Sequence, residues 1–139
     1  MKTTVLLVED SKMQKLANER ILSHAGYTVL CAVDGEQAVI VAREKLPDVV
    51  LLDILLPKLS GLQVLGILRE HADTARIPVI ILSTLPQVNE AKLKLAGAAG
   101  YFEKSRLLDD KNGEKIFLEM LDHIVKEARE RTMAKATSA

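Results

Sequence analysis

Five short apolar runs alternate with segments of helical periodicity, and this alternation limits the folds that the chain can adopt. The runs lie at residues 5–8, 27–33, 49–52, 78–82 and 100–103. Runs this short suit strands that are buried on both faces, as in a parallel sheet. The order therefore predicts an α/β fold, a doubly wound five-stranded parallel sheet with helices on both faces joined by right-handed crossovers.

The helices are expected to begin at capping residues and to turn apolar side chains toward the sheet. Ser11 precedes the first helix and Gly26 closes it. Asp34 and Ser60 each stand three residues before a glutamine, which is the spacing of a capping box. The expected inward residues are Leu62, Leu65 and Leu68 in the third helix, Ala91, Leu95 and Ala96 in the fourth, and Phe117, Met120, Leu121, Ile124 and Ala128 in the last.

Composition excludes several classes of protein. Of 139 residues, 48% are hydrophobic and 27% charged, as in one globular domain. The 19 basic and 19 acidic residues cancel, so no surface for direct binding to nucleic acid or to a membrane is predicted. No apolar run has the length of a signal or membrane-spanning segment, so we expect a cytoplasmic protein. The domain is expected at residues 1–131, with 132–139 as a disordered tail.

Polar residues end four of the five predicted strands. These residues are Glu9 and Asp10, Asp53, Ser83 and Lys104. They should meet, because the carboxyl ends of parallel strands share one edge of the sheet, where open α/β sheets bind ligands. Three crowded carboxylates repel one another unless a cation lies between them, and oxygen ligands suit Mg²⁺. One carboxylate could then attack a phosphoryl group that Lys104 and Ser83 contact. The alternative is a structural ion network around Lys104.

Four motifs stand in order along the chain: VEDS at 8–11, DILLPKLSG at 53–61, ILST at 81–84 and GYFEK at 100–104. Together they resemble the receiver domain of two-component response regulators, of which the chemotaxis receiver is a single-domain example. The resemblance covers about residues 4–128. It implies a flavodoxin-like sheet with strand order 2-1-3-4-5. It also implies a phosphoprotein of phosphorelay signal transduction, a switch that catalyses only its own phosphorylation and dephosphorylation.

The same resemblance implies individual roles. Asp53 would accept the phosphoryl group as an aspartyl phosphate, which Lys104 and Ser83 would contact. The expected magnesium ligands are Glu9, Asp10, Asp53 and the carbonyl of Leu55. The expected switch pair is Ser83 and Tyr101. Leu55 and Leu85 would flank the path of an attacking water. The donor would be a sensor histidine kinase or a histidine phosphotransfer protein, and the phosphorylated form would bind a downstream protein target.

Several residues are expected to stay outside this chemistry or to depart from the family pattern. His24, His71 and His123 lack metal or phosphorelay spacing and are expected to be solvated helix residues. Cys31, the only cysteine, is expected in the core. Ser105 stands where the family usually has proline, so a trans peptide bond and a different path are expected for the polar loop after Lys104.

Three other functions remain open. A phosphatase of the haloacid-dehalogenase type would need a second acid two residues after Asp53, where this chain has Leu55. A flavodoxin-like cofactor domain would need a Gly-, Ser- or Thr-rich loop after the first strand, where Glu9 and Asp10 stand. An adaptor that resembles a receiver but works without phosphorylation usually lacks one of the acids or the lysine, and this chain keeps them all.

Overall fold

A five-stranded parallel sheet forms the centre of the molecule. The computed structural model describes residues 3–83, 90–109 and 111–137. The strands are β1 (Thr4–Val8), β2 (Thr28–Ala32), β3 (Val49–Asp53), β4 (Val79–Ser83) and β5 (Gly100–Glu103). All pair in parallel in the order β2-β1-β3-β4-β5. The predicted fold class and strand order are confirmed.

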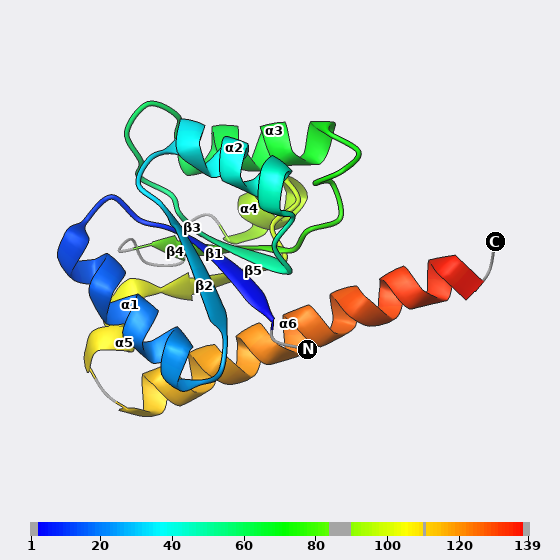
Figure 1. Ribbon diagram of the computed structural model, residues 1–139. Coiled ribbons are helices and arrows are strands. Elements are labelled where there is room, and N and C mark those ends of the chain that lie inside the picture. Colours follow the sequence, from blue (N-terminus) through cyan, green and yellow to red (C-terminus); the bar gives the residue numbers. More distant parts are fainter. Residues whose placement is uncertain (1–2, 84–89, 110, 138–139) are drawn as a thin grey trace.

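Helices cover both faces of this sheet (Figure 1). They are α1 (Lys12–His24), α2 (Gly35–Lys45), α3 (Gly61–Glu70), α4 (Glu90–Leu95), α5 (Lys104–Asp109) and α6 (Lys111–Thr137). One face packs against α2, α3 and α4, and the other against α1, α5 and α6. Within the described residues, no helix has the length and apolar character that a membrane span requires.

Alternating strand residues supply the two cores. On β1, Leu6 and Val8 belong to the core under α2–α4, whereas Val5 and Leu7 belong to the core under α1, α5 and α6. Strands β3 and β4 alternate in the same way. Because both sides of β1, β3 and β4 are buried, these strands read as unbroken apolar runs in the sequence.

The predicted caps begin the first three helices. The Ser11 hydroxyl accepts the backbone N–H of Gln14 at 3.4 Å. Ser60 and its glutamine form the complete capping box. Asp34 accepts from the Gln37 backbone N–H at 2.8 Å, but the Gln37 side chain accepts from the Val33 N–H instead of closing a box. The capping-box prediction is therefore confirmed at α3 and only half correct at α2.

The structure corrects two predicted helix faces. In α3, Leu62 is 36% exposed and Val64 is buried in its place. In α4, Leu95 is 90% exposed and Ala91 and Ala96 are also exposed, whereas Leu93 is buried. Helix α4 has six residues with apolar side chains on opposite sides, so its spacing did not reveal which side meets the sheet.

The segment after β5 also differs from the prediction. Helix α5 begins at Lys104, where we expected a loop. The Lys104–Ser105 peptide bond is trans, as expected. Helix α6 buries Phe117, Leu121 and Ile124 of the predicted stripe. It then continues to Thr137, through residues expected to form a tail, and its last turns extend past the sheet (Figure 1).

Candidate functional site

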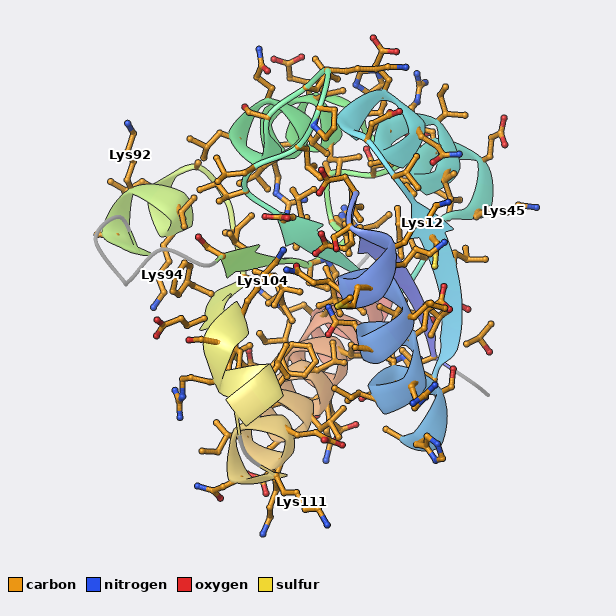
Figure 2. The ribbon with its side chains drawn as sticks, turned by 90° about the vertical axis from the view of Figure 1, so that its left-hand side faces the viewer. Lys12, Lys45, Lys92, Lys94, Lys104 and Lys111 are labelled. Atoms are coloured by element: carbon orange, nitrogen blue, oxygen red, sulfur yellow. The ribbon has the colours of Figure 1, made fainter. Side chains whose placement is uncertain are left out.

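The predicted site residues converge at the carboxyl edge of the sheet. Asp53 and Ser83 are the last residues of β3 and β4, Glu9 and Asp10 follow β1, and Lys104 follows β5. The register aligns these ends, since Asp53 pairs with Leu82 on the neighbouring strand. Lys104 points into the middle of this edge, whereas the other lysines labelled in Figure 2 are exposed.

Lys104 joins the two buried acids. Its Nζ donates to Glu9 Oε2 and to Asp53 Oδ2, each at 2.6 Å. Lys104 and Asp53 are each 7% exposed and Glu9 is 1% exposed. A buried ammonium held by two buried carboxylates is a charge-assisted network with little access to water. This arrangement confirms the prediction that the side chains at the carboxyl ends of β1, β3 and β5 lie close together.

Burial and pairing shift the proton affinities of this network. Burial raises the pKa of Glu9, and the hydrogen bond from Lys104 opposes that rise. Burial would lower the pKa of Lys104, but the hydrogen bonds to Asp53 and Glu9 raise it above its ordinary value. Lys104 is therefore fully cationic at neutral pH.

Backbone N–H groups hold the second oxygen of each buried acid. Ser11 donates to Glu9 Oε1 at 3.2 Å, and Leu55 donates to Asp53 Oδ1 at 3.1 Å. The turns after β1 and β3 thus fix both carboxylates before any ligand arrives. The Leu55 side chain is 64% exposed at the rim of the site.

Three carboxylates lie close enough to bind one cation. Glu9, Asp10 and Asp53 each offer an oxygen, and these oxygens lie within 4.8 Å of one another. Asp10 is exposed while the other two are buried, so the cluster opens to solvent on the Asp10 side. A hard, oxygen-preferring cation such as Mg²⁺ fits this donor set.

Ser83 and Tyr101 lie on neighbouring strands near the same edge. Ser83 is 1% exposed and ends β4. Tyr101, on β5, is half-buried and packs against the core under α2–α4. Tyr101 pairs with Ile81 in the sheet, two residues before Ser83. The structure thus places the expected switch residues on paired strands.

Gln14 is a site residue that the sequence did not identify. Its Oε1 accepts from Lys104 Nζ at 2.8 Å, so Lys104 is bound by a third oxygen. Gln14 lies in the first turn of α1, three residues after the Ser11 cap. In the sequence, the only indication that Gln14 belongs to the site is its position shortly after the acids that follow β1.

Cys31 and the histidines lie apart from the site contacts. Cys31 is half-buried rather than in the core, and its thiol donates to Glu19 Oε1 at 2.6 Å. Burial raises the pKa of this thiol to about 12, with Glu19 contributing. His24 and His123 are exposed as expected, whereas His71 is half-buried, and its buried Nδ1 has no hydrogen-bond partner among the described residues.

Comparisons with known proteins agree with this fold. The family model described as the response regulator receiver domain matches residues 5–112. Protein PilH of Pseudomonas aeruginosa is 39% identical over 101 residues, 72% of this chain and 84% of PilH. Response regulator MprA of Mycolicibacterium vanbaalenii is 34% identical over 111 residues, 79% of this chain but 47% of MprA. A gliding motility regulatory protein of Myxococcus xanthus is 33% identical over 121 residues, 86% of this chain but 15% of that protein.

Solved structures give the same result. A response regulator from Chloroflexus aurantiacus has a TM-score of 0.81 and 26% identity, covering 91% of this chain and 99% of that chain. The receiver domain of a sensor histidine kinase from Pseudomonas aeruginosa has a TM-score of 0.77 and 28% identity, with the same coverage. A magnesium ion is coordinated in the active site cleft of that second protein.

The structure is therefore a doubly wound domain of the flavodoxin-like type with an acidic cluster at the carboxyl edge of its sheet. The chain belongs to the receiver domain family of two-component response regulators.

Proposed function

We propose that this receiver accepts a phosphoryl group on Asp53, in a reaction that requires Mg²⁺. The observation that carries the proposal is the buried contact between Asp53 and Lys104, beside Glu9 and Asp10. A nucleophilic carboxylate, a fixed cation and an open acidic cluster are the components that phosphoryl transfer to an aspartate needs. The donor would be the phosphohistidine of a sensor kinase or of a phosphotransfer protein.

The transfer would exchange one bond to phosphorus for another. An oxygen of Asp53 attacks the phosphorus in line with the histidine nitrogen. The new O–P bond forms as the P–N bond breaks, and the bonding electrons remain on the imidazole of the donor. Lys104 lies within hydrogen-bond distance of Asp53 and would stabilise the negative charge on the transferred group.

Glu9, Asp10 and Asp53 would hold Mg²⁺, with the carbonyl of Leu55 as the further protein ligand. When bound, the metal would neutralise charge on the phosphoryl oxygens. The small separation of the three carboxylate oxygens supports this assignment, since without a cation their charges would repel.

Ser83 and Tyr101 would convert phosphorylation into a change of surface. The phosphoryl group would draw the Ser83 hydroxyl toward Asp53, and Tyr101 would move further into the core. A downstream protein would then bind the altered face.

We place the protein in the cytoplasm, where kinases form phosphohistidine from ATP. We also propose that the domain covers residues 1–131.

The test is to incubate the protein with acetyl phosphate and Mg²⁺ and to measure incorporated phosphate by mass spectrometry. Asp53→Asn should abolish incorporation while the circular dichroism spectrum stays unchanged. Asp48→Asn is the matched control. Asp48 lies at the amino-terminal edge of the sheet, opposite the site, where its carboxylate accepts a hydrogen bond from the Thr4 N–H at 2.8 Å. Retained labelling in Asp53→Asn would refute the acceptor assignment. No labelling of the wild type would favour the phosphorylation-independent adaptor, and continuous release of phosphate from esters would favour the phosphatase.

A further inference from the structure

Three oxygens from three elements fix the orientation of the Lys104 ammonium. Its Nζ donates to Glu9 Oε2 and to Asp53 Oδ2, each at 2.6 Å, and to Gln14 Oε1 at 2.8 Å. An ammonium carries three N–H donors and no acceptor. Each donor therefore has one acceptor, and the ammonium has no reason to rotate about its bond to the side chain.

The turn between β1 and α1 supplies two of these three acceptors. Glu9 directly follows β1, and Gln14 lies in the first turn of α1. Ser11, between them, holds both: its backbone N–H donates to Glu9 Oε1 at 3.2 Å, and its hydroxyl accepts from the Gln14 backbone N–H at 3.4 Å. Two of the N–H directions of Lys104 are thus set without Asp53, and the tetrahedral geometry of the ammonium then points the third at Asp53.

Gln14 satisfies its share of the ammonium without adding charge. Glu9 and Asp53 are buried carboxylates, and they already outnumber the single positive charge of Lys104. A third carboxylate on Nζ would increase this excess of negative charge. Without any acceptor at position 14, the third donor would turn to water or share an oxygen of the two acids. A neutral amide avoids both outcomes.

We infer that Gln14 is a positioning residue for phosphoryl transfer, which with Glu9 aims the remaining N–H of Lys104 at the group arriving on Asp53. This inference rests on the proposed phosphorylation of Asp53. On transfer, the hydrogen bond from Lys104 to the Asp53 carboxylate passes to a phosphoryl oxygen, while the bonds to Glu9 and Gln14 stay in place. The donor is then oriented before the negative charge develops, which is the condition for effective electrostatic stabilisation.

Two substitutions remove the contact in different ways. Gln14→Met keeps an unbranched side chain without the acceptor, and Gln14→Asn keeps the amide on a chain one methylene too short to reach Nζ. Each should slow the initial labelling of Asp53 by acetyl phosphate at saturating Mg²⁺ roughly fivefold, the equivalent of about one hydrogen bond. Gln37→Met is the control, because Gln37 is exposed on α2, away from Lys104. Labelling of either Gln14 variant at the wild-type rate, or faster, would overturn the inference.

The NMR signal of the Lys104 ammonium provides a readout that a purely structural role of Gln14 would not change. In the wild type, three acceptors should slow exchange of the ammonium protons with water and give a resolved signal with a nuclear Overhauser effect to the Gln14 side chain. That effect should persist when beryllofluoride and Mg²⁺ replace the labile phosphoryl group. In Gln14→Met the ammonium signal should broaden through faster exchange.

Loss of the Overhauser effect on binding of beryllofluoride, or an equally sharp ammonium signal in Gln14→Met, would contradict the positioning role. Failure of the proposed function looks different. In that case the wild type would gain no phosphate on Asp53, whereas the ammonium signals of the unmodified wild type and of Gln14→Met would still differ.

Discussion

Lys104 illustrates how a single residue organises the site. Its charge is buried, yet it is balanced by Glu9 and Asp53 and its pKa is raised rather than lowered. A buried cation with two anionic partners keeps Asp53 in a fixed orientation before any phosphodonor binds. Removing Lys104 would leave two buried carboxylates without their cationic partner, whereas removing either acid leaves the other acid paired with Lys104.

A residue-scale prediction concerns the lifetime of the phosphoryl group. The Leu55 backbone touches Asp53 and its exposed side chain is apolar, so it cannot orient an attacking water. Leu55→Asn should therefore speed loss of the phosphoryl group several-fold, measured after removal of the donor at excess Mg²⁺. Leu95→Asn changes another exposed leucine and should have no effect. Equal decay in Leu55→Asn and the wild type would show that this side chain does not shield the bond. Leu85, the other expected shield, lies outside the described residues.

The positions of site residues were predictable where backbone topology alone decides them. Asp53 and Lys104 adjoin strand ends, and parallel pairing brings such ends together whatever the side chains are. Gln14 was missed because its contact depends on the packing of α1 over the sheet and on a rotamer. Neither can be derived from helical spacing.

At the scale of elements, the turn from β3 to α3 links the fold to the site. Gly61 donates to the Ile54 carbonyl at 3.0 Å. A Cβ on Gly61 would lie 2.7 Å from Ile54 Cα and 2.8 Å from the Asp53 carbonyl oxygen. Helix α3 can begin this close to β3 only because position 61 lacks a side chain.

Gly61→Ala should therefore destabilise the protein by about 1–3 kcal/mol, as overpacking does. It should also slow phosphorylation of Asp53, because the clash displaces the backbone that carries the acid. Denaturant unfolding and acetyl phosphate labelling measure the two effects. The control is Gly66→Ala in the same helix, where an added Cβ meets nothing within 4 Å. If Gly61→Ala behaved like Gly66→Ala, the close approach would have no role in stability or in the site.

Elements were predicted best where several signals agreed. Strands β1, β3 and β4 have buried apolar runs, and α3 has a complete capping box. Helix α5 was not expected, because six residues give little periodicity and the segment follows a charged strand end. Short helices take their orientation from the core that they meet, and this is a tertiary property.

At the scale of the whole molecule, α6 has two parts. Up to Val125 it contributes Phe117, Leu121, Ile124 and Val125 to the core, while Thr132 and Met133 are exposed. The sequence predicted the buried stripe. The helical extension was not predicted, because charged residues with few apolar ones are equally typical of a tail and of a solvated helix.

Removing residues 132–139 should thus change the free energy of unfolding by no more than about 0.5 kcal/mol, as for changes at exposed sites. Leu121→Ala in the same helix should cost about 2–5 kcal/mol, because Leu121 is 0% exposed. Thermal and urea unfolding of the wild type, the truncated protein and Leu121→Ala provide the comparison. A large loss of stability on truncation would place the domain boundary beyond residue 131.

Peptide mapping of the phosphorylated wild-type protein tests the central claim most directly. After treatment with acetyl phosphate, digestion and mass spectrometry should find one added phosphoryl group, on the peptide that contains Asp53. The label should appear with Mg²⁺ and be absent when a chelator removes the metal, because the acidic cluster of Glu9, Asp10 and Asp53 must be neutralised. A label on a different peptide, or equal labelling without the metal, would contradict the account.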